Sequence, residues 1–464
     1  GLQITNEFEA ILIKVNDKTL DKFALRNKDA TEKILPELAG ADWIVKSVDK
    51  KAVTKNPLPP FTTSTLQQEA FRRIGFSAKQ TMMFAQQLYE GVELGEGPVG
   101  LITYMRTDSV NLSEDSLKEA RDFLKKEVGE NYSLPLPRRF RTQTKGAQEA
   151  HEAVRPTDPW RTPDAVKEFL ERRQYKLYDL IWRRFMATQM PEAIFDATSA
   201  DIAAKNFIFR ATGQIVKFDG FLKIYPMKFS EVMLPELIPQ EKLELEELKP
   251  EQHFTQAPAR FSEATLVKIM EKYGIGRPST YAPTISTIQD RGYVEKHERR
   301  FLKPTEVGFI VNDLLVEHFP EVVDVQFTAK MEEELDDIAL GAKEWQPVIR
   351  EFYEPFAKHL AEKYEEVKKH EITETTDEVC EKCGKPMVVK LGRFGKFLAC
   401  SGFPECKNAK PIKKELELIG MKCPKCSEGD IIVKRTRRGK IFFGCSRYPK
   451  CDYASWTDPR KNEV

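Results

Sequence analysis

The sequence predicts a multidomain α+β protein in which a β-rich part is interrupted by an inserted helical part. A helix-turn-helix unit and two small zinc ribbons follow. Three observations lead to this prediction. Strand-like sequence lies on both sides of a helical stretch, the 464 residues exceed what one core usually serves, and all eight cysteines lie after residue 379. We therefore expect several domains.

The composition is that of an ordinary soluble protein, with 41% hydrophobic and 31% charged residues. We find no apolar run of the ~18 residues that a membrane-spanning helix needs. The first residues also lack the basic region, apolar region and cleavage site of a secretory signal. We therefore expect a cytoplasmic protein with no membrane partner.

Residues 1–63 are predicted to contain strands. Short apolar runs at 10–15 and 43–45 alternate with polar breaks, and the part ends in the rigid segment Asn56-Pro57-Leu58-Pro59-Pro60. From Ser64 the pattern becomes helical and stays so to residue 190. Three helices are expected there: one opened by a Ser77 to Gln80 capping box and ending before Gly91, one from Ser113 to Gly129, and one from Pro163 through Met190.

Strand-like sequence returns in residues 191–261, chiefly from Ala193 to Tyr225, and an acidic run, Glu241 to Glu251, closes this part. Strands, then helices, then strands suggest that the helical domain 64–190 is inserted into one β-rich domain made of 1–63 and 191–261.

Residues 262–370 are predicted to form a helix-turn-helix with a β wing. After a helix beginning near Ser262 come a glycine-rich turn, a helix from Thr280 to Arg291, a strand pair around Lys296-His297-Glu298 and a helix after Thr305. An ordinary helical hairpin is the alternative.

The cysteines form one unit that occurs twice, at 378–410 and 421–456. Each unit has a Cys-x2-Cys pair, a basic and apolar hairpin, and a Cys-x5-Cys pair. This spacing is typical of a four-thiolate zinc site, whereas disulfides are disfavoured in a cytosolic chain. We expect two structural Zn²⁺ ions, held by Cys380, Cys383, Cys400 and Cys406, and by Cys423, Cys426, Cys445 and Cys451.

The cysteine-rich tail is basic although the net charge of the chain is only +1. From Cys380 to Val464 there are 20 Lys and Arg against 9 Asp and Glu. Aromatic residues such as Phe397, Phe442 and Tyr448 lie among these cations, a pattern suited to stacking on unpaired bases beside phosphates. A solvated tail, with the aromatics in small cores, is the alternative.

The segment Leu101-Ile102-Thr103-Tyr104-Met105-Arg106-Thr107-Asp108-Ser109 could carry phosphoryl chemistry. If it is extended, Tyr104 and Arg106 share one face. A phenol there could attack phosphorus while the guanidinium holds two phosphate oxygens. Tyrosine and arginine two residues apart are, however, common on ordinary sheet surfaces.

Three peptides together resemble type IA DNA topoisomerases. The segment around Tyr104 resembles their active-site peptide, and Met105 before the arginine is similar to the bacterial topoisomerase I branch. Residues 145–157, KGAQEAHEAVRPT, and 272–282, KYGIGRPSTYA, resemble two further family segments in the expected order. The resemblance covers nearly the whole chain.

The resemblance implies a β-rich gate domain flanking the helical domain that bears the tyrosine. It implies relaxation of negatively supercoiled DNA through transient single-strand cleavage, a 5′-phosphotyrosine link, strand passage and religation. We expect single-stranded and negatively supercoiled DNA as partners, and a monomer. The implied catalytic residues are Tyr104, Arg106 and His151, and the implied DNA contacts are Lys145, Arg155, Arg277, Ser279 and Thr280. On chemistry alone, His151 could be structural and Lys145 a solvated charge.

The family also implies an N-terminal TOPRIM domain with an Asp-x-Asp-x-Glu cluster for Mg²⁺. We find no Asp-x-Asp in these residues, which begin with Gly1, and expect a fragment that binds DNA but cleaves it poorly without that domain. A non-catalytic zinc-ribbon protein that binds single-stranded DNA is the alternative. A tyrosine recombinase would need further separated Arg and His residues, and a reverse gyrase would add a Gly-x4-Gly-Lys-Ser/Thr loop that these residues lack.

Overall fold

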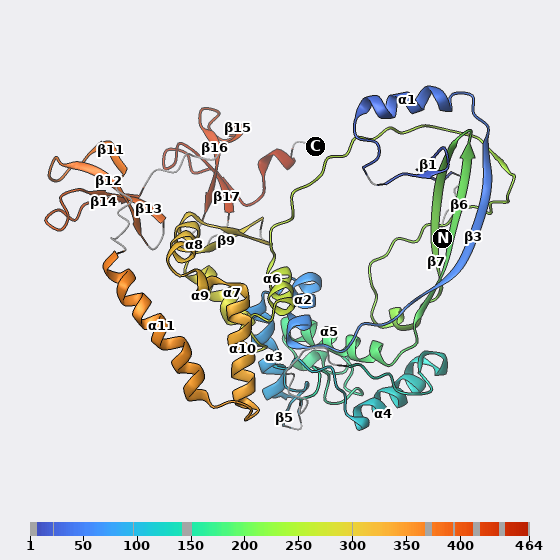
Figure 1. The fold of residues 1–464 in the computed structure, drawn as a ribbon, viewed down its shortest axis with the longest axis horizontal. Coiled ribbons are helices and arrows are strands. Elements are labelled where there is room, and N and C mark those ends of the chain that lie inside the picture. The colour runs from blue at the N-terminus through green and yellow to red at the C-terminus, as the bar shows by residue number, and fades with distance from the viewer. Residues whose placement is uncertain are drawn as a thin grey trace. The chain divides into compact units, whose positions relative to one another are not determined.

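The structure, a computed structural model, has two compact units, Gly1–Lys363 and Tyr364–Val464 (Figure 1). None of the described helices is long and apolar enough to cross a membrane. The predicted class, α+β with two cysteine-rich ribbons, is confirmed. The finer domain boundaries stay a prediction. The structure describes residues 7–21, 23–95, 97–141, 151–298, 300–366, 374–392, 395–411, 418–435 and 441–462.

A six-stranded antiparallel sheet joins segments from both sides of the helical part (Figure 1). Its order is β2-β1-β7-β6-β3-β8, so early strands pair with strands that follow the helices. This pairing fits an inserted helical part. The strands are β1 (Ile11–Val15), β2 (Lys18–Thr19), β3 (Trp43–Lys55), β6 (Ala193–Ala204), β7 (Phe207–Phe218) and β8 (Lys242–Leu243).

Two elements of this part differ from the sequence prediction. A helix, α1 (Lys28–Leu38), lies within residues predicted as strands, and Asn27 caps it by accepting a hydrogen bond from the amide of Ala30 at 2.9 Å. The acidic run contributes the edge strand β8, which pairs with Trp43 and Ile44 of β3. Leu243 and Leu248 pack on the sheet core, so this acidic segment belongs to the β-rich part and does not only separate it from the residues that follow.

The helical part contains α2 (Thr63–Ile74), α3 (Ala78–Glu90), α4 (Glu114–Phe123) and α5 (Arg172–Thr188), with the short strands β4 (Val92–Glu93) and β5 (Pro98–Val99). The Ser77 capping box and the Ser113 cap are present as predicted, and one π turn carries the second helix on to Gly129. The third helix begins nine residues later than predicted, because Glu171 and Gln174 form its capping box. Phe61, Met105, Tyr178 and Phe185 lie in the core of this part.

The predicted helix, turn, helix and strand pair follow: α6 (Glu263–Lys272), α7 (Tyr281–Asp290), β9 (Val294–His297), β10 (Phe301–Pro304) and α8 (Glu306–His318). Val267, Met270 and Tyr281 pack against Ala78 at the start of α3. This apolar contact fixes the turn between α6 and α7 relative to the helical part. Further helices are α9 (Pro320–Val323), α10 (Val325–Ala339) and α11 (Trp345–Glu366).

The second unit contains two four-stranded antiparallel sheets, each in sequential strand order. In each, the third strand ends at a cysteine, Cys400 or Cys445, and the last cysteine, Cys406 or Cys451, follows before the fourth strand. The first sheet has β11 (Glu374–Val379), β12 (Pro386–Gly392), β13 (Gly395–Cys400) and β14 (Ala409–Pro411). The second has β15 (Leu418–Lys422), β16 (Asp430–Arg435), β17 (Ile441–Cys445) and β18 (Ala454–Ser455).

Candidate active site

The segment that carries Tyr104 is irregular, with a bend at Met105, and does not belong to a regular sheet. Its only bridge in the described residues joins Ile102 to Pro156. Met105 and Thr107 are buried, whereas Tyr104 is 38% exposed and Arg106 is also exposed. Tyr104 and Arg106 are therefore both exposed on a loop whose alternate residues, Met105 and Thr107, are buried. That the two side chains share one face stays a prediction.

Thr63, the first residue of α2, holds this segment through hydrogen bonds on its buried side. Its hydroxyl donates to the carbonyl of Met105 at 2.7 Å and accepts from the amide of Thr107 at 2.9 Å. Its own amide donates to the carbonyl of Thr107 at 2.8 Å. Because Thr63 is fully buried, these bonds fix the backbone on both sides of Arg106 without water.

We expect Thr63→Val to lower the free energy of unfolding by about 2–3 kcal/mol, because it leaves buried backbone groups at Met105 and Thr107 without a partner. Urea unfolding measures the loss, and hydrogen exchange at Thr107 should accelerate. Thr65→Val, which removes a hydroxyl from the capping box of the same helix, is the matched control and should leave exchange at Thr107 unchanged. Equal acceleration in both variants would contradict this role of Thr63.

The second motif, residues 151–157 in the described part of the chain, runs beside the Tyr104 segment. The amide of Thr103 donates to the carbonyl of Arg155 at 2.9 Å, and the Thr103 hydroxyl donates to the carbonyl of Ala153 at 2.7 Å. These bonds bring His151 to Tyr104, with ring centroids 6.3 Å apart and the rings edge to face. Two motifs far apart in sequence therefore meet at one surface.

Of the two cations predicted in the second motif, Arg155 and Lys145, the structure describes only Arg155. Arg155 is largely buried, and its guanidinium donates to Glu152 Oε2 at 2.5 Å and to the Pro156 carbonyl at 2.9 Å. A DNA contact by Arg155 would therefore have to compete with these bonds. Lys145 lies outside the described residues.

Tyr104 also packs edge to face against Tyr89, with centroids 5.3 Å apart. Sequence reasoning missed this neighbour. Within the described residues, the Arg106 guanidinium has no hydrogen bond or ion pair of its own. An exposed arginine without a protein anion beside an exposed phenol is suited to receive an external phosphate.

The third motif forms the turn from α6 to α7. Gly274 and Gly276 adopt positive φ of 71° and 78°, which explains glycine at both positions. The Thr280 hydroxyl accepts from the amide of Arg277 at 2.8 Å, so it stabilises the turn itself. Ser279 and Thr280 are exposed, while Arg277 is partly buried and ion-paired with Asp336 of α10.

A contact through the start of α2 links the helix before this turn to the Tyr104 segment. Ser64, the residue after Thr63, donates a short hydrogen bond to the Glu271 carboxylate near the end of α6. Neighbouring hydroxyls at the start of α2 thus contact the Tyr104 segment and the helix leading into the turn. The sequence carried no signal of these pairings.

Asp108 is a further residue that sequence reasoning missed. It follows Tyr104 and Arg106 at a spacing of two, is half-buried, and lies in the electrostatic field of Arg277, Asp336 and His151. Burial raises the pKa of Asp108 and repulsion by Asp336 adds to the rise, while Arg277 and His151 oppose it. The period of two could have identified this residue.

The eight cysteines gather into two sets of four, as predicted. Within each set all sulfur atoms lie within 4.8 Å of one another, and all eight thiols are free. In the second set, Cys423 with Cys451 at 3.7 Å and Cys426 with Cys445 at 3.6 Å match the ~3.8 Å edge of a tetrahedron with Zn–S bonds of about 2.3 Å. In the first set, Cys380 with Cys406 at 3.7 Å matches it too, while Cys383 and Cys400 lie closer, at 3.1 Å. Both sets therefore fit zinc.

Backbone amides prepare the sulfur atoms for a cation. The amide of Gly429 donates to Cys426 Sγ at 3.4 Å, and this bond lowers the pKa of the thiol to about 7. The amides of Gly402 and Arg447 donate to Cys400 Sγ and Cys445 Sγ at 3.3 and 3.4 Å. These two bonds favour the thiolate, the form that binds zinc, although the neighbouring thiols raise the pKa of Cys400 and Cys445 overall.

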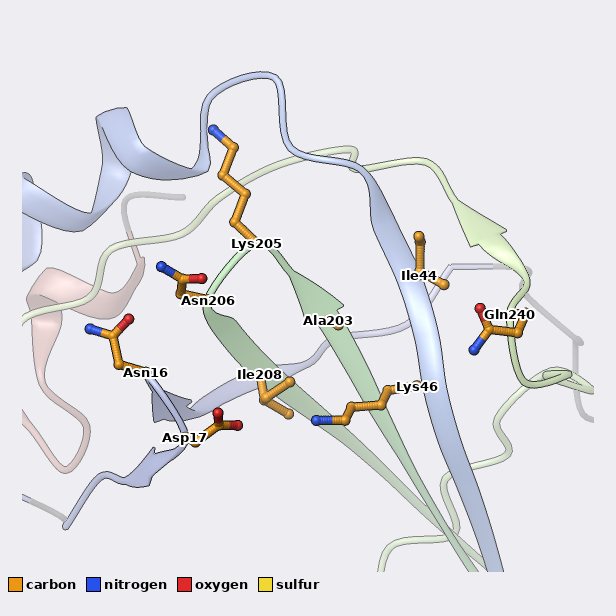
Figure 2. A pocket seen from close by; sticks show the side chains of 9 residues that line it. All are labelled: Asn16, Asp17, Ile44, Lys46, Ala203, Lys205, Asn206, Ile208 and Gln240. Carbon is orange, nitrogen blue, oxygen red and sulfur yellow. The ribbon is translucent and has the colours of Figure 1, made fainter.

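A pocket of about 580 Å³ lies elsewhere, at one end of the six-stranded sheet (Figure 2). It lies between hairpin turns: Asn16 and Asp17 have positive φ of 48° and 58°, as a two-residue hairpin requires. Lys205, one of its lining residues, donates to the carbonyls of Glu37 and Ala39 at the end of α1. None of the predicted site residues lines this pocket.

The fold agrees with comparisons to known proteins. A family profile described as DNA topoisomerase matches residues 2–350, and one described as topoisomerase DNA binding C4 zinc finger matches residues 377–415 and 420–460. The solved full-length topoisomerase I from Thermotoga maritima, in a monoclinic crystal form, is 35% identical with a TM-score of 0.67. The match covers 88% of this chain and 64% of that one, so the chain spans about 64% of that protein's length.

Proposed function

Because the chain belongs to the bacterial DNA topoisomerase I family, we propose that it carries the tyrosine chemistry of a type IA enzyme that relaxes negatively supercoiled DNA. The observation that supports this most is the exposed pair Tyr104 and Arg106, held from below by Thr63 and bordered by His151. Single-stranded DNA is the proposed substrate, because a phosphodiester must reach a phenol on an open surface.

In the proposed reaction the Tyr104 Oη attacks a phosphorus atom of one DNA strand. The Oη–P bond forms, the bond from phosphorus to the 3′ oxygen breaks, and the 3′ oxygen takes up a proton as the phenol loses one. The strand beyond the cut is left on a 5′-phosphotyrosine. Phenolate, with a free pKa of about 10, leaves readily, so attack by the 3′-hydroxyl restores the strand after the other strand passes.

Arg106 is the proposed phosphate anchor, and His151 a contact with the same phosphate. Arg277, Ser279 and Thr280 are proposed to hold the backbone of the single strand at the turn before α7, where exposed hydroxyls and the helix start favour phosphate. Arg155 and Lys145 are proposed as further backbone contacts. The zinc ribbons are proposed to bind single-stranded DNA through their basic hairpins.

The residues present do not fit a magnesium site of the TOPRIM kind. The sequence has no Asp-x-Asp, and the two cysteine sets are the metal-binding clusters in the described residues. We therefore propose that Mg²⁺ and a proton donor for the leaving oxygen come from a TOPRIM domain, and that cleavage requires that domain.

A label-transfer assay tests this function. The chain is incubated with Mg²⁺ and a 3′-end-labelled single-stranded oligonucleotide, alone and with a separately supplied TOPRIM domain, then analysed on denaturing gels. We expect label to stay on the protein when the domain is present, whereas the same oligonucleotide labelled at its 5′ end should leave none. Tight DNA binding without an adduct under either condition would favour a non-catalytic zinc-ribbon module.

A further inference from the structure

The guanidinium of Arg277 already has an anionic partner. Its Nε and Nη2 donate to the same oxygen of Asp336, Oδ2, at 3.1 and 2.7 Å. Its Nη1 donates to the carbonyls of Gly274 and Gly276 at 3.3 and 3.0 Å. The arginine proposed to hold DNA thus has protein partners of its own, and its side chain is only 23% exposed.

The geometry of the Arg277–Asp336 pair would allow a phosphate to replace the carboxylate. Two guanidinium nitrogens share one carboxylate oxygen, whereas the strongest arginine pairs give each nitrogen its own oxygen. A phosphate presents two free oxygens to the same fork. The Asp336 contact is therefore strong enough to orient Arg277 but is weaker than a paired phosphate contact.

The charges around Arg277 oppose a polyanion. Besides Asp336, Glu332 of the same helix and Asp108 of the Tyr104 segment act on this region through their charge. Three carboxylates therefore act on the surroundings of one guanidinium and would repel a phosphate that approaches it. A DNA phosphate can approach only at the expense of this arrangement.

We propose that Asp336 is a further residue of the DNA-binding site: its carboxylate occupies the Arg277 guanidinium until a DNA phosphate displaces it. The inference rests on the proposed function, in which Arg277 contacts the single strand. Asp336 sets the affinity of Arg277 for DNA, because its carboxylate and the phosphate compete for the same guanidinium. The free energy needed to displace the Asp336 carboxylate from Arg277 lowers the affinity for DNA. Return of the carboxylate to Arg277 helps the strand to dissociate, as an enzyme that must repeatedly bind and release DNA requires.

The neighbouring residue provides a matched control. Asp337 lies next to Asp336 on α10 and pairs with Lys343 at 3.2 Å instead of with Arg277. Asp336→Asn and Asp337→Asn therefore remove the same charge from the same helix and keep the side-chain shape. Only the first removes the competitor of the phosphate.

Binding of a fluorescent oligothymidylate to the full chain, measured by anisotropy at low salt, tests the proposal. We expect Asp336→Asn to bind about three- to thirty-fold more tightly than wild type, because Arg277 becomes available, and Asp337→Asn to bind like wild type. The gain should shrink as salt is raised. Hydrogen exchange should show stronger DNA-dependent protection of residues 274–281 in Asp336→Asn, which separates this site from binding by the ribbons.

A second background locates the effect on Arg277. In Arg277→Gln, the gain from Asp336→Asn should disappear. Arg277→Met, which also removes the charge, serves if the glutamine variant loses its thermal transition. Equal affinities of Asp336→Asn and Asp337→Asn, weaker binding by Asp336→Asn, or a gain that survives in Arg277→Gln would overturn the proposal. Failure of the wild-type chain to bind the oligothymidylate would instead contradict the proposed function.

Discussion

Tyr104→Phe is expected to abolish the covalent DNA adduct completely, because it removes the one oxygen proposed to attack phosphorus. The ring and its packing stay in place, since Tyr104 touches Tyr89 and His151 through its ring. We expect affinity for single-stranded DNA to change less than about three-fold, because phosphate contacts come from other side chains. The assay is retention of 3′ label on denatured protein, with the TOPRIM domain supplied.

Tyr89→Phe is the matched control for this experiment. Tyr89 is 41% exposed, lies 5.3 Å from Tyr104 between ring centroids, and could be mistaken for the nucleophile by position alone. We expect this variant to form the adduct at nearly the wild-type level. An adduct that persists in Tyr104→Phe but is lost in Tyr89→Phe would show that Tyr89, and not Tyr104, is the nucleophile. An adduct that persists in both variants would contradict attack by either tyrosine.

Much of the site could be predicted because its signals are local. Cysteine spacing predicted both thiolate clusters, and the alternation of buried and exposed residues around Met105 was implicit in an extended segment. Helix starts with a side-chain cap, at Ser77, Ser113 and Ser262, were located within a residue or two. A cap leaves a signal within four residues of chain, which a single sequence retains.

The remaining features depend on contacts between distant residues. The bonds from Thr63 to Thr107 and from Ser64 to Glu271 bring together segments that no periodicity relates. The pairing of Arg277 with Asp336 likewise joins a turn to a helix 59 residues later. Helix α1 was missed although Asn27 caps it, because flanking strand-like runs outweighed a short helical signal. Tertiary packing decided these cases.

Loss of one zinc ligand is the second change with a large expected effect. Cys445→Ser should leave the second ribbon without bound zinc and unfolded, while the first ribbon keeps its metal. The described ribbon core consists of the cysteines with a few neighbours such as Ile431 and Phe443, which is too little to fold alone. Structural zinc contributes about 10–16 kcal/mol to such units, so losing one of four ligands should weaken zinc binding at least about a hundred-fold.

Zinc content after dialysis against a mild chelator measures the result, with two ions expected per wild-type chain and one per Cys445→Ser chain. Cys400→Ser is the matched variant in the first ribbon, and the double variant should hold none, because each ribbon supplies all four of its own thiolates. Loss of both ions in either single variant would show that the ribbons share their metal sites. Two retained ions would mean that the four thiolates do not act as one ligand set. If the ribbons hold the single strand, Cys445→Ser should also weaken oligothymidylate binding and reduce its salt dependence, whereas transfer of label to Tyr104 at saturating DNA should persist.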